Sequence, residues 1–307
     1  MTQVHILFEN PDWMPPLRGA LESRGLAFVE HFTEGGTLDT TEPPPEGVWI
    51  NRMSPSSHTR GHQAGVVFAR EYLGWLEANG RPVINGTRAF TMEVSKVQQY
   101  AALTRHGIPT PRTKAVIGGA EALKAAARDM SVPFITKHNQ GGKGLGVSLF
   151  RDLDTFDRFV DDGSLEPSPD GVMLLQQYIE APEPFITRVE IVDGRFLYAI
   201  KSNTEQGFEL CPADACQIGD LACPVGDTGL FALREEITAD DPLVRKLVAF
   251  CQAEGLGLAG IEFIEDRAGN RYVYDINGTS NYNSDVEGKH GFSGMGAVAE
   301  LAARLLA

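Results

Sequence analysis

The chain has 307 residues, 42% of them hydrophobic and 22% charged, which is ordinary for a soluble globular protein of two or three compact domains. Its formal net charge of −14 at pH 7 argues against nucleic acid or an anionic membrane as a partner, because both attract basic surfaces. The N-terminus lacks the features of a signal peptide, and no apolar stretch approaches the roughly 20 residues that span a bilayer, so a cytoplasmic protein is expected.

The first part of the chain alternates strand-like and helix-like segments. Strands are expected at Val4–Phe8 and Val48–Asn51, and helices at Pro16–Arg24 and Gln63–Ala78. Three consecutive prolines mark the stretch Thr37–Gly47 as a surface loop. Because strands that alternate with helices usually form parallel sheets, a parallel sheet is predicted here.

The next segment predicts two helices and a strand–turn–strand unit. Apolar residues on one face predict a helix over Phe90–Arg105, and Gly107 after it is typical of a helix that ends in a left-handed residue. A helix at Glu121–Asp129 precedes a strand at Val132–Lys137. A glycine-rich turn then leads into the strand Val147–Phe150.

The remainder predicts a mostly antiparallel sheet with two covering helices. A hairpin is expected across Asp193-Gly194, a dipeptide that tolerates positive φ in a type I′ turn. The expected strands are Val172–Ile179, Phe185–Val192, Arg195–Lys201, Leu258–Glu265 and Arg271–Asn277, and the expected helices are Asp241–Glu254 and Ser293–Leu306.

These patterns predict an α/β protein whose C-terminal part is α+β. Residues 1–85 are expected to form an N-terminal parallel-sheet domain, residues 86–175 a small α+β lid, and residues 176–307 an antiparallel-sheet domain.

The four cysteines predict neither a disulfide framework nor a metal site. Cys211, Cys216, Cys223 and Cys251 are few and unevenly spaced. The segment from Cys211 to Cys216 lacks the paired CxxC spacing of zinc sites. We expect reduced thiols without a metal role.

The glycine-rich turn, in PFITKHNQGGKGLGVSLF, predicts a phosphate cradle, because glycines let several backbone N–H groups converge on an anion. It is not a Walker loop, since Gly144 follows Lys143 where Ser or Thr is required. It is not a dinucleotide fingerprint, since a strand follows the turn instead of a helix. The alternative is a hairpin tip that carries incidental lysines.

A candidate metal site lies near the end of the chain. Alternate residues of a strand share a face, so Asp275 and Asn277 project together. If the hairpin is centred between Ala268 and Gly269, Glu262 lies opposite Asp275. Hard divalent ions such as Mg²⁺ prefer this set of oxygen ligands. The alternative is the solvated face of a surface hairpin.

In series, these motifs resemble the ATP-grasp superfamily, and in particular the ribosomal-protein glutamate ligases and their lysine-biosynthesis relatives (the RimK-like family). The resemblance spans nearly the whole chain and rests on the motifs together. These are Asn51-Arg52-Met53-Ser54, Pro82-Val83-Ile84-Asn85, Lys96, Gly107-Ile108-Pro109-Thr110-Pro111, Lys137 with its glycine turn, Gln176-Gln177-Tyr178-Ile179, Arg188, and Glu262 with Asp275 and Asn277.

The resemblance implies ATP and Mg²⁺ as cofactors, with two ions expected and Mn²⁺ as an alternative. Lys96 and Lys137 would bind the ATP phosphates. Arg188 and Lys201 would face the γ-phosphate and the tetrahedral intermediate. The residues implied to cover the phosphates are Gly141, Gly142, Gly144 and Gly146, those implied to bind adenine are Gln176, Gln177, Tyr178 and Ile179, and the implied metal ligands are Glu262, Asp275 and Asn277. The candidates for gripping the substrate are Arg52, Ser54, Arg60, His62 and Asn283.

Several positions depart from the family pattern. Ile186 stands where an Asp usually precedes the catalytic Arg, and the acid types of Glu262 and Asp275 are exchanged. The Arg- and Asn-containing acceptor segment is replaced by Ser202–Phe208 and the stretch from Cys211 to Cys216. Glutamate as the substrate therefore does not follow.

The reaction expected from the resemblance joins a small-molecule carboxylate to an amine through an acyl phosphate, with an amino acid or a derivative as a substrate. One alternative is a phosphotransferase of the same fold that acts on a hydroxyl. Another is a nucleotide-binding regulatory protein, although such a protein need not retain Lys96, Lys137, Arg188 and the oxygen ligands together. Whether the acceptor is a peptide or a protein, and whether the chain forms a homo-oligomer, stay open.

Overall fold

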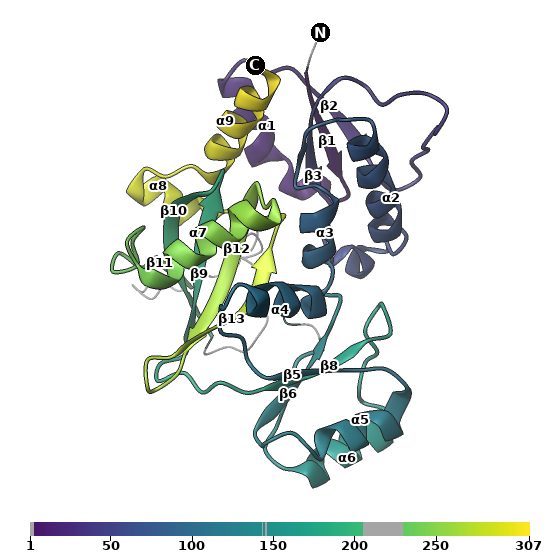
Figure 1. The fold of residues 1–307 in the computed structure, drawn as a ribbon, viewed down its shortest axis with the longest axis vertical. Coiled ribbons are helices and arrows are strands. Elements are labelled where there is room, and N and C mark those ends of the chain that lie inside the picture. The colour runs from purple at the N-terminus through teal and green to yellow at the C-terminus, as the bar shows by residue number, and fades with distance from the viewer. Residues whose placement is uncertain (1–2, 143, 145, 205–229) are drawn as a thin grey trace, which may run out of the picture.

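The computed structural model describes residues 3–142, 144, 146–204 and 230–307, which form three sheets with covering helices. In Figure 1 the N-terminal sheet lies at the top, the C-terminal sheet in the centre and the sheet formed by the middle of the chain at the bottom. Residues 205–208 of the replaced acceptor segment, and Cys211, Cys216 and Cys223, lie outside the described residues. Within the described ranges, no helix is both long and apolar enough to cross a membrane.

The N-terminal sheet is parallel throughout, in the order β2-β1-β3-β4, which confirms the predicted parallel sheet. Its elements are β1 (Gln3–Phe8), β2 (Phe28–Phe32), β3 (Gly47–Arg52), β4 (Val83–Ile84), η1 (Pro11–Trp13), α1 (Pro15–Ser23), η2 (Ser57–Arg60) and α2 (Gly65–Ala78). The last helix of the chain, α9 (Gly294–Leu306), packs on α1 and contacts β1 and β3. The loop that follows the carboxyl end of β3 supplies Ser54 and Ser56 to a cleft, and this end is where open α/β sheets usually bind ligands.

The single helix predicted over Phe90–Arg105 is wrong, because the chain forms two helices, α3 (Thr87–Glu93) and α4 (Lys96–Arg105). Ser95 between them has extended backbone angles, and its side chain accepts a hydrogen bond from the backbone N–H of Gln98, which makes it an N-cap. The backbone N–H of Lys96 donates to the carbonyl oxygen of Asn139 at 3.1 Å. The break thus places Lys96 in the first turn of α4.

The middle sheet is antiparallel, in the order β5-β8-β6-β7. Its elements are β5 (Thr113–Val116), α5 (Gly119–Ala127), β6 (Phe134–His138), β7 (Ser148–Phe150), α6 (Leu153–Asp161) and β8 (Met173–Gln177). Phe134, Phe150 and Phe156 are buried together between this sheet and its two helices. The pairing of β6 with β7 confirms the predicted strand–turn–strand unit.

The C-terminal sheet is antiparallel as predicted, in the order β11-β10-β9-β12-β13. Its elements are β9 (Phe185–Val192), β10 (Arg195–Asn203), β11 (Phe231–Leu233), α7 (Pro242–Glu254), β12 (Leu258–Glu265), β13 (Arg271–Asn277) and α8 (Ser284–His290). Asp193 and Gly194 have φ of 53° and 63°, as the predicted hairpin turn requires.

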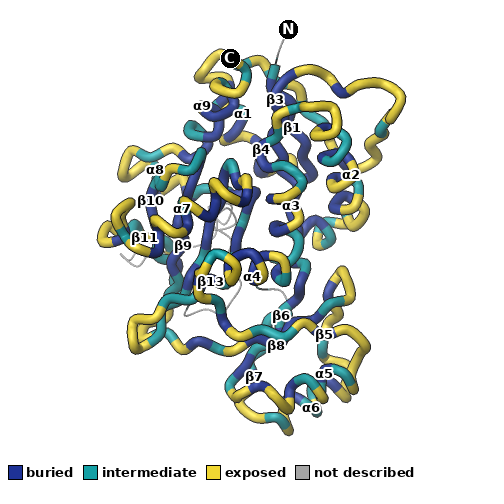
Figure 2. Tube along the Cα trace, viewed as in Figure 1, coloured by how far each residue is buried: buried dark blue, intermediate teal, exposed yellow. Residues whose placement is uncertain are grey.

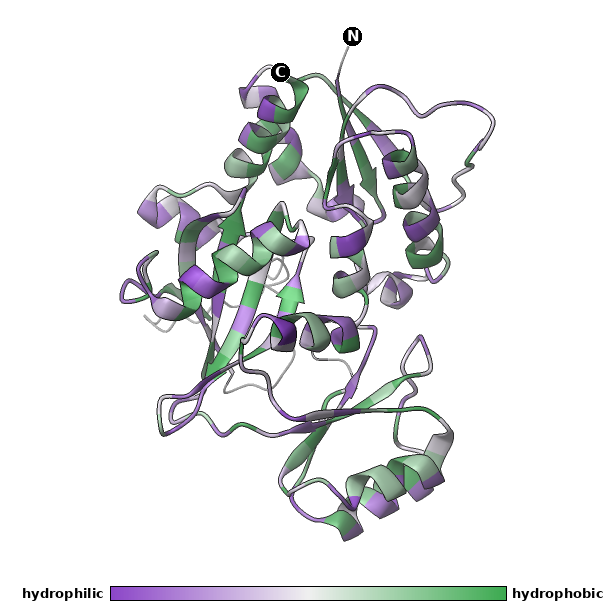
Figure 3. Ribbon diagram, viewed as in Figure 1, coloured by the Kyte–Doolittle hydropathy of each residue, from purple (hydrophilic) through white to green (hydrophobic). Residues whose placement is uncertain are grey.

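The main core lies between one face of the C-terminal sheet and helices α3, α4 and α7. Figure 2 shows its strands buried while the outer sides of the helices are exposed, and Figure 3 shows the same helices alternating hydrophobic and hydrophilic residues. The opposite face carries the polar residues Arg188, Glu190 and Glu262, while Tyr198 and Ile200 on that face pack with Val286. The predicted boundary at residue 175 falls within β8, and α9 packs on the N-terminal sheet, so the division into three domains stays a prediction.

Candidate active site

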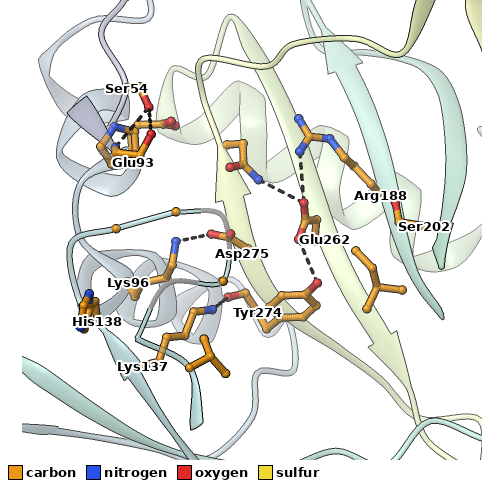
Figure 4. Close-up of a pocket in the computed structure, with 18 of the residues that line it drawn as sticks. Ser54, Glu93, Lys96, Lys137, His138, Arg188, Ser202, Glu262, Tyr274 and Asp275 are labelled. Carbon is orange, nitrogen blue, oxygen red and sulfur yellow. Dashed lines mark hydrogen bonds and ion pairs between the residues drawn. The ribbon is translucent and has the colours of Figure 1, made fainter. Parts of the chain in front are cut away.

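A cleft lies where the three sheets meet (Figure 4). The N-terminal sheet contributes the loop after β3, the middle sheet contributes β6 and the glycine turn, and the C-terminal sheet contributes its polar face. The polar and charged side chains that line the cleft are Ser54, Ser56, Glu93, Lys96, Lys137, His138, Gln176, Arg188, Ser202, Thr204, Glu262, Tyr274, Asp275, Asn277, Thr279, Ser280 and Asn281. The cleft therefore brings together residues that lie more than 200 positions apart in the sequence, such as Ser54 and Asn281.

The predicted pairing of the metal residues is confirmed, because Glu262 of β12 lies directly opposite Asp275 of β13. Asn277 lies farther along β13, and its Nδ2 is 3.5 Å from Glu262 Oε1. Burial leaves 15% of the Glu262 side chain and 16% of the Asp275 side chain exposed, so both are accessible from the cleft. A divalent ion could reach three oxygen donors here.

The two carboxylates repel each other, and cationic side chains surround them. Burial raises the pKa of Glu262, and the neighbouring Asp275 carboxylate raises it further. Burial acts in the same direction on Asp275, but Lys96 and Lys137 outweigh it, so the pKa of Asp275 lies below its usual value. A divalent ion between the carboxylates would relieve their repulsion.

The residues present fit Mg²⁺ bound together with a triphosphate. In the part of the chain that the structure describes, no three or more His, Cys, Asp or Glu side chains form a group that could hold a metal alone. The set is two carboxylates and one amide, and Mg²⁺ commonly completes such a set with phosphate oxygens and water.

Two lysines reach the carboxylates from different elements. Lys96 of α4 forms an ion pair with Asp275. Lys137 of β6 lies with its Nζ 3.3 Å from the carbonyl oxygen of Tyr274 and 5.0 Å from the centre of the Tyr274 ring. Burial lowers the pKa of Lys137, while the charges of Asp275 and Glu262 act to raise it. Both lysines are therefore placed to meet anionic groups beside the candidate metal ligands.

The glycine turn lines the cleft through Gly141, Gly142 and Gly144. Gly146 has a φ of 73° and packs so closely on the ring of His138 that a Cβ there would collide with it. His138 Nε2 lies 3.0 Å from the carbonyl oxygen of Glu166. A glycine is therefore required at position 146 both for the backbone angle and for the close approach.

Arg188 of β9 lies beside the metal residues. Its Nη1 donates to Glu262 Oε1 at 3.1 Å, its Nε donates to Glu190 at 2.6 Å, and its Nη2 donates to Ser280 Oγ at 2.8 Å. The guanidinium lies over Gly260, where a Cβ would collide with it. The buried Glu190 thus holds the guanidinium next to the carboxylate cluster.

The structure corrects the expectation that Lys201 faces the same site as Arg188. Lys201 of β10 pairs with Thr187, whereas Arg188 pairs with Ile200. Neighbouring residues of a strand point to opposite faces, so Lys201 points away from the cleft. Its Nζ lies 3.3 Å from Glu183 and 3.9 Å from the centre of the Phe185 ring.

Among the residues expected at adenine, Gln176 lines the cleft, and its Nε2 donates to Tyr100 Oη at 2.7 Å and to Thr113 Oγ1 at 2.9 Å. Gln177, Tyr178 and Ile179 follow at the end of β8, where the chain leaves the middle sheet, and do not line the cleft. Their role at adenine stays a prediction.

The candidate substrate-binding residues divide into two groups. Ser54 lines the cleft, and its Oγ lies 2.8 Å from that of Ser56. The other four do not line the cleft themselves. Arg52 donates to Ser280 O and Asn281 Oδ1 of two cleft residues, Arg60 and His62 both bind the carboxylate of Glu9, and Asn283 is the N-cap of α8. Direct substrate contact by these four residues stays a prediction. Arg60 already forms the ion pair that the buried carboxylate of Glu9 requires.

Glu93 and Tyr274 are among the cleft residues that the sequence did not indicate. Glu93 of α3 accepts hydrogen bonds from Gly278 N and Thr279 Oγ1, and so fixes the loop after Asn277. Tyr274 donates from its Oη to Glu262 Oε2 at 2.9 Å. The sequence carried no signal for Glu93, and strict strand alternation places Tyr274 on the face away from Asp275.

Part of the chain is similar in sequence to known proteins. Residues 94–209 match the family model of the RimK-like ATP-grasp domain. D-alanine–D-alanine ligase B of Xanthomonas campestris is 28% identical over 190 residues, which is 58% of this chain and 56% of that protein. Tetrahydromethanopterin:alpha-L-glutamate ligase of Methanosarcina acetivorans is 30% identical over 151 residues, or 47% of this chain and 46% of that protein. The chain thus spans about half the length of these curated relatives.

Two solved structures share the fold along nearly the full chain. An ATP-grasp RimK domain protein of Sphaerobacter thermophilus superposes with a TM-score of 0.69 at 18% identity, covering 97% of this chain and 98% of that one. D-cycloserine synthetase DcsG superposes with a TM-score of 0.67 at 19% identity, covering 98% and 99%. Residues 94–209 therefore carry a RimK-like ATP-grasp domain, and the chain shares the fold of these two solved structures.

Proposed function

We propose that the protein is an ATP-dependent carboxylate–amine ligase that forms an amide bond through an acyl phosphate. The observation that carries the proposal is the convergence in one cleft of Lys96 and Lys137, the oxygen donors of Glu262, Asp275 and Asn277, and Arg188. Phosphoryl transfer from ATP requires cations that bind the phosphates, ligands that hold a metal ion, and a group such as a guanidinium that stabilises the charge developing on the transferred phosphoryl group.

Each element of the cleft has a part in the proposed reaction. Lys96, Lys137 and the glycine turn hold the triphosphate, and Glu262, Asp275 and Asn277 would hold Mg²⁺. Mg²⁺, when bound, neutralises charge on the γ-phosphoryl group. Arg188 stabilises the phosphoryl group during attack by the substrate carboxylate, and then the oxyanion formed when the amine attacks the acyl phosphate.

No protein nucleophile is needed, because the substrate carboxylate itself attacks the γ-phosphorus. The contribution of the chain is positioning and charge neutralisation in a site partly closed to water. Ser54 and Ser56 line the same cleft as the candidate metal ligands and are candidates for orienting the acid.

The relatives support an amino acid or a derivative as a substrate, since their names describe ligation of D-alanine and of L-glutamate. Solved structures of the ATP-grasp ligase PsnB contain a precursor, Mg and ADP, which supports Mg²⁺ and ATP as the cofactors and leaves peptides within the range of substrates.

The proposal predicts that ADP release requires both an acid and an amine. Purified protein with ATP and Mg²⁺ should be screened against amino acids and short peptides, singly and in pairs, with ADP measured by a coupled assay. Productive pairs should release ADP well above either compound alone, because the acyl phosphate turns over only when an amine attacks it. ADP release with a hydroxyl compound alone would favour a phosphotransferase instead.

A further inference from the structure

Tyr274 faces the cleft because of an irregularity in β13. The register pairs Glu262 with Asp275 and then Phe263 with Val273, which leaves Tyr274 without a partner on β12. Such a bulge adds one residue to a strand and re-aims its side chains. Tyr274 and its neighbour Asp275 therefore both line the cleft, where regular alternation would separate them.

As Figure 4 shows, the side chain of Tyr274 lies between Glu262, a candidate metal ligand, and Lys137, a candidate phosphate-binding residue. Its Oη donates to Glu262 Oε2 at 2.9 Å, while Arg188 Nη1 donates to Glu262 Oε1 at 3.1 Å. Each oxygen of the carboxylate is thus held by a separate donor. On the other side of Tyr274, the centre of its ring lies 5.0 Å from Lys137 Nζ. The backbone carbonyl oxygen of Tyr274 accepts a hydrogen bond from the same Nζ at 3.3 Å.

We infer that Tyr274 is a positioning residue that aims the Glu262 carboxylate at the metal through its hydroxyl and supports Lys137 through its ring. The inference rests on the proposed function, because it takes Glu262 as a metal ligand and Lys137 as a phosphate ligand. Donors to a ligating carboxylate fix its orientation, and their loss typically costs about 10–100-fold in metal affinity or activity. An ammonium over an aromatic face gains a further attraction that a Leu side chain cannot supply.

Two substitutions separate the two contacts. Tyr274→Phe removes the hydroxyl and keeps the ring, and Tyr274→Leu removes both. Tyr272→Phe is the matched control, since Tyr272 lies on the same strand and its Oη lies 3.5 Å from Asp266 in the hairpin turn. The probes are the nucleotide analogue AMPPNP, measured by calorimetry without metal, and Mn²⁺, measured by electron paramagnetic resonance in the presence of AMPPNP.

Tyr274→Phe is expected to weaken Mn²⁺ binding to the nucleotide complex by about tenfold and to leave metal-free AMPPNP binding unchanged. Tyr274→Leu is expected to weaken Mn²⁺ binding similarly and metal-free AMPPNP binding by about threefold to tenfold. Tyr272→Phe should match the wild type in both measurements. Circular dichroism and thermal unfolding check that each variant is folded.

Mn²⁺ affinity that is equal in Tyr274→Phe and the wild type would overturn the inference. So would a loss of metal-free AMPPNP binding in Tyr274→Phe as large as that in Tyr274→Leu, because the ring would then have no separate part. Failure of the proposed function gives a different result, in which the wild type itself binds neither AMPPNP nor Mn²⁺, or binds both without ligating any acid.

Discussion

Replacing Asp275 by Asn is expected to lower ADP formation by about 10³-fold or more, while the protein stays folded. The substitution keeps the size of the side chain and removes a charge that faces both the metal position and Lys96. Metal ions supply several kcal/mol of transition-state stabilisation in phosphoryl transfer, and each 1.36 kcal/mol corresponds to a factor of ten in rate. The measurement is kcat/KM for ADP release with a productive acid and amine.

Two further variants separate the loss of a metal ligand from the loss of the ion pair. Asn277→Ala removes an oxygen ligand without touching Lys96 and should also reduce turnover strongly. Asp285→Asn makes the same chemical change as Asp275→Asn on the exposed first turn of α8 and should leave turnover unchanged. If Asp275→Asn and Asn277→Ala instead lost stability on the scale of a core truncation, about 2–5 kcal/mol, these residues would be structural.

Removal of the Arg188 guanidinium is expected to slow the formation of acyl phosphate by about 10²–10³-fold, which is typical for the loss of one donor to developing charge. A single substitution would also leave the buried Glu190 without its partner, and breaking a buried ion pair from one side costs about 3–5 kcal/mol of stability. The informative comparison is therefore the double variant Arg188→Gln/Glu190→Gln against Glu190→Gln alone.

The Glu190→Gln variant keeps the guanidinium next to Glu262 and Ser280, so it should retain most of the wild-type rate. The double variant should bind ATP with nearly wild-type affinity, because Lys96 and Lys137 remain. It should still form acyl phosphate more slowly than Glu190→Gln alone. Equal rates in the two variants would show that Arg188 only balances the charge of Glu190.

The sequence was sufficient to predict the parts of the fold that follow local rules. The turn at Asp193-Gly194 and the pairing of Glu262 with Asp275 follow from turn chemistry and hairpin register, and the structure confirms both. The break at Ser95 was missed because the apolar face of the predicted helix continues through it, and the contact that stabilises the break comes from Asn139, distant in sequence.

The parts of the candidate site that the sequence could not predict depend on contacts that no local pattern reveals. The sequence shows Arg60 and His62 only as polar loop residues. Their common partner, the buried Glu9, lies more than 50 positions earlier in the chain and is brought to them by the fold. Lys201 was placed beside Arg188 by hairpin position, but the observed register is offset by one residue, which turns its side chain to the other face. Tyr274 faces the cleft because of a bulge in β13, which the regular alternation of side chains along a strand does not predict.

The most direct test of the account is whether an acyl phosphate forms. Wild-type protein with ATP, Mg²⁺ and a candidate acid should be incubated with hydroxylamine, and ADP and hydroxamate should be measured together. Because an acyl phosphate is a strong electrophile, we expect hydroxamate to accumulate in step with ADP even before the natural amine is known. Accumulation of ADP with a stable phosphorylated alcohol and no hydroxamate would contradict it.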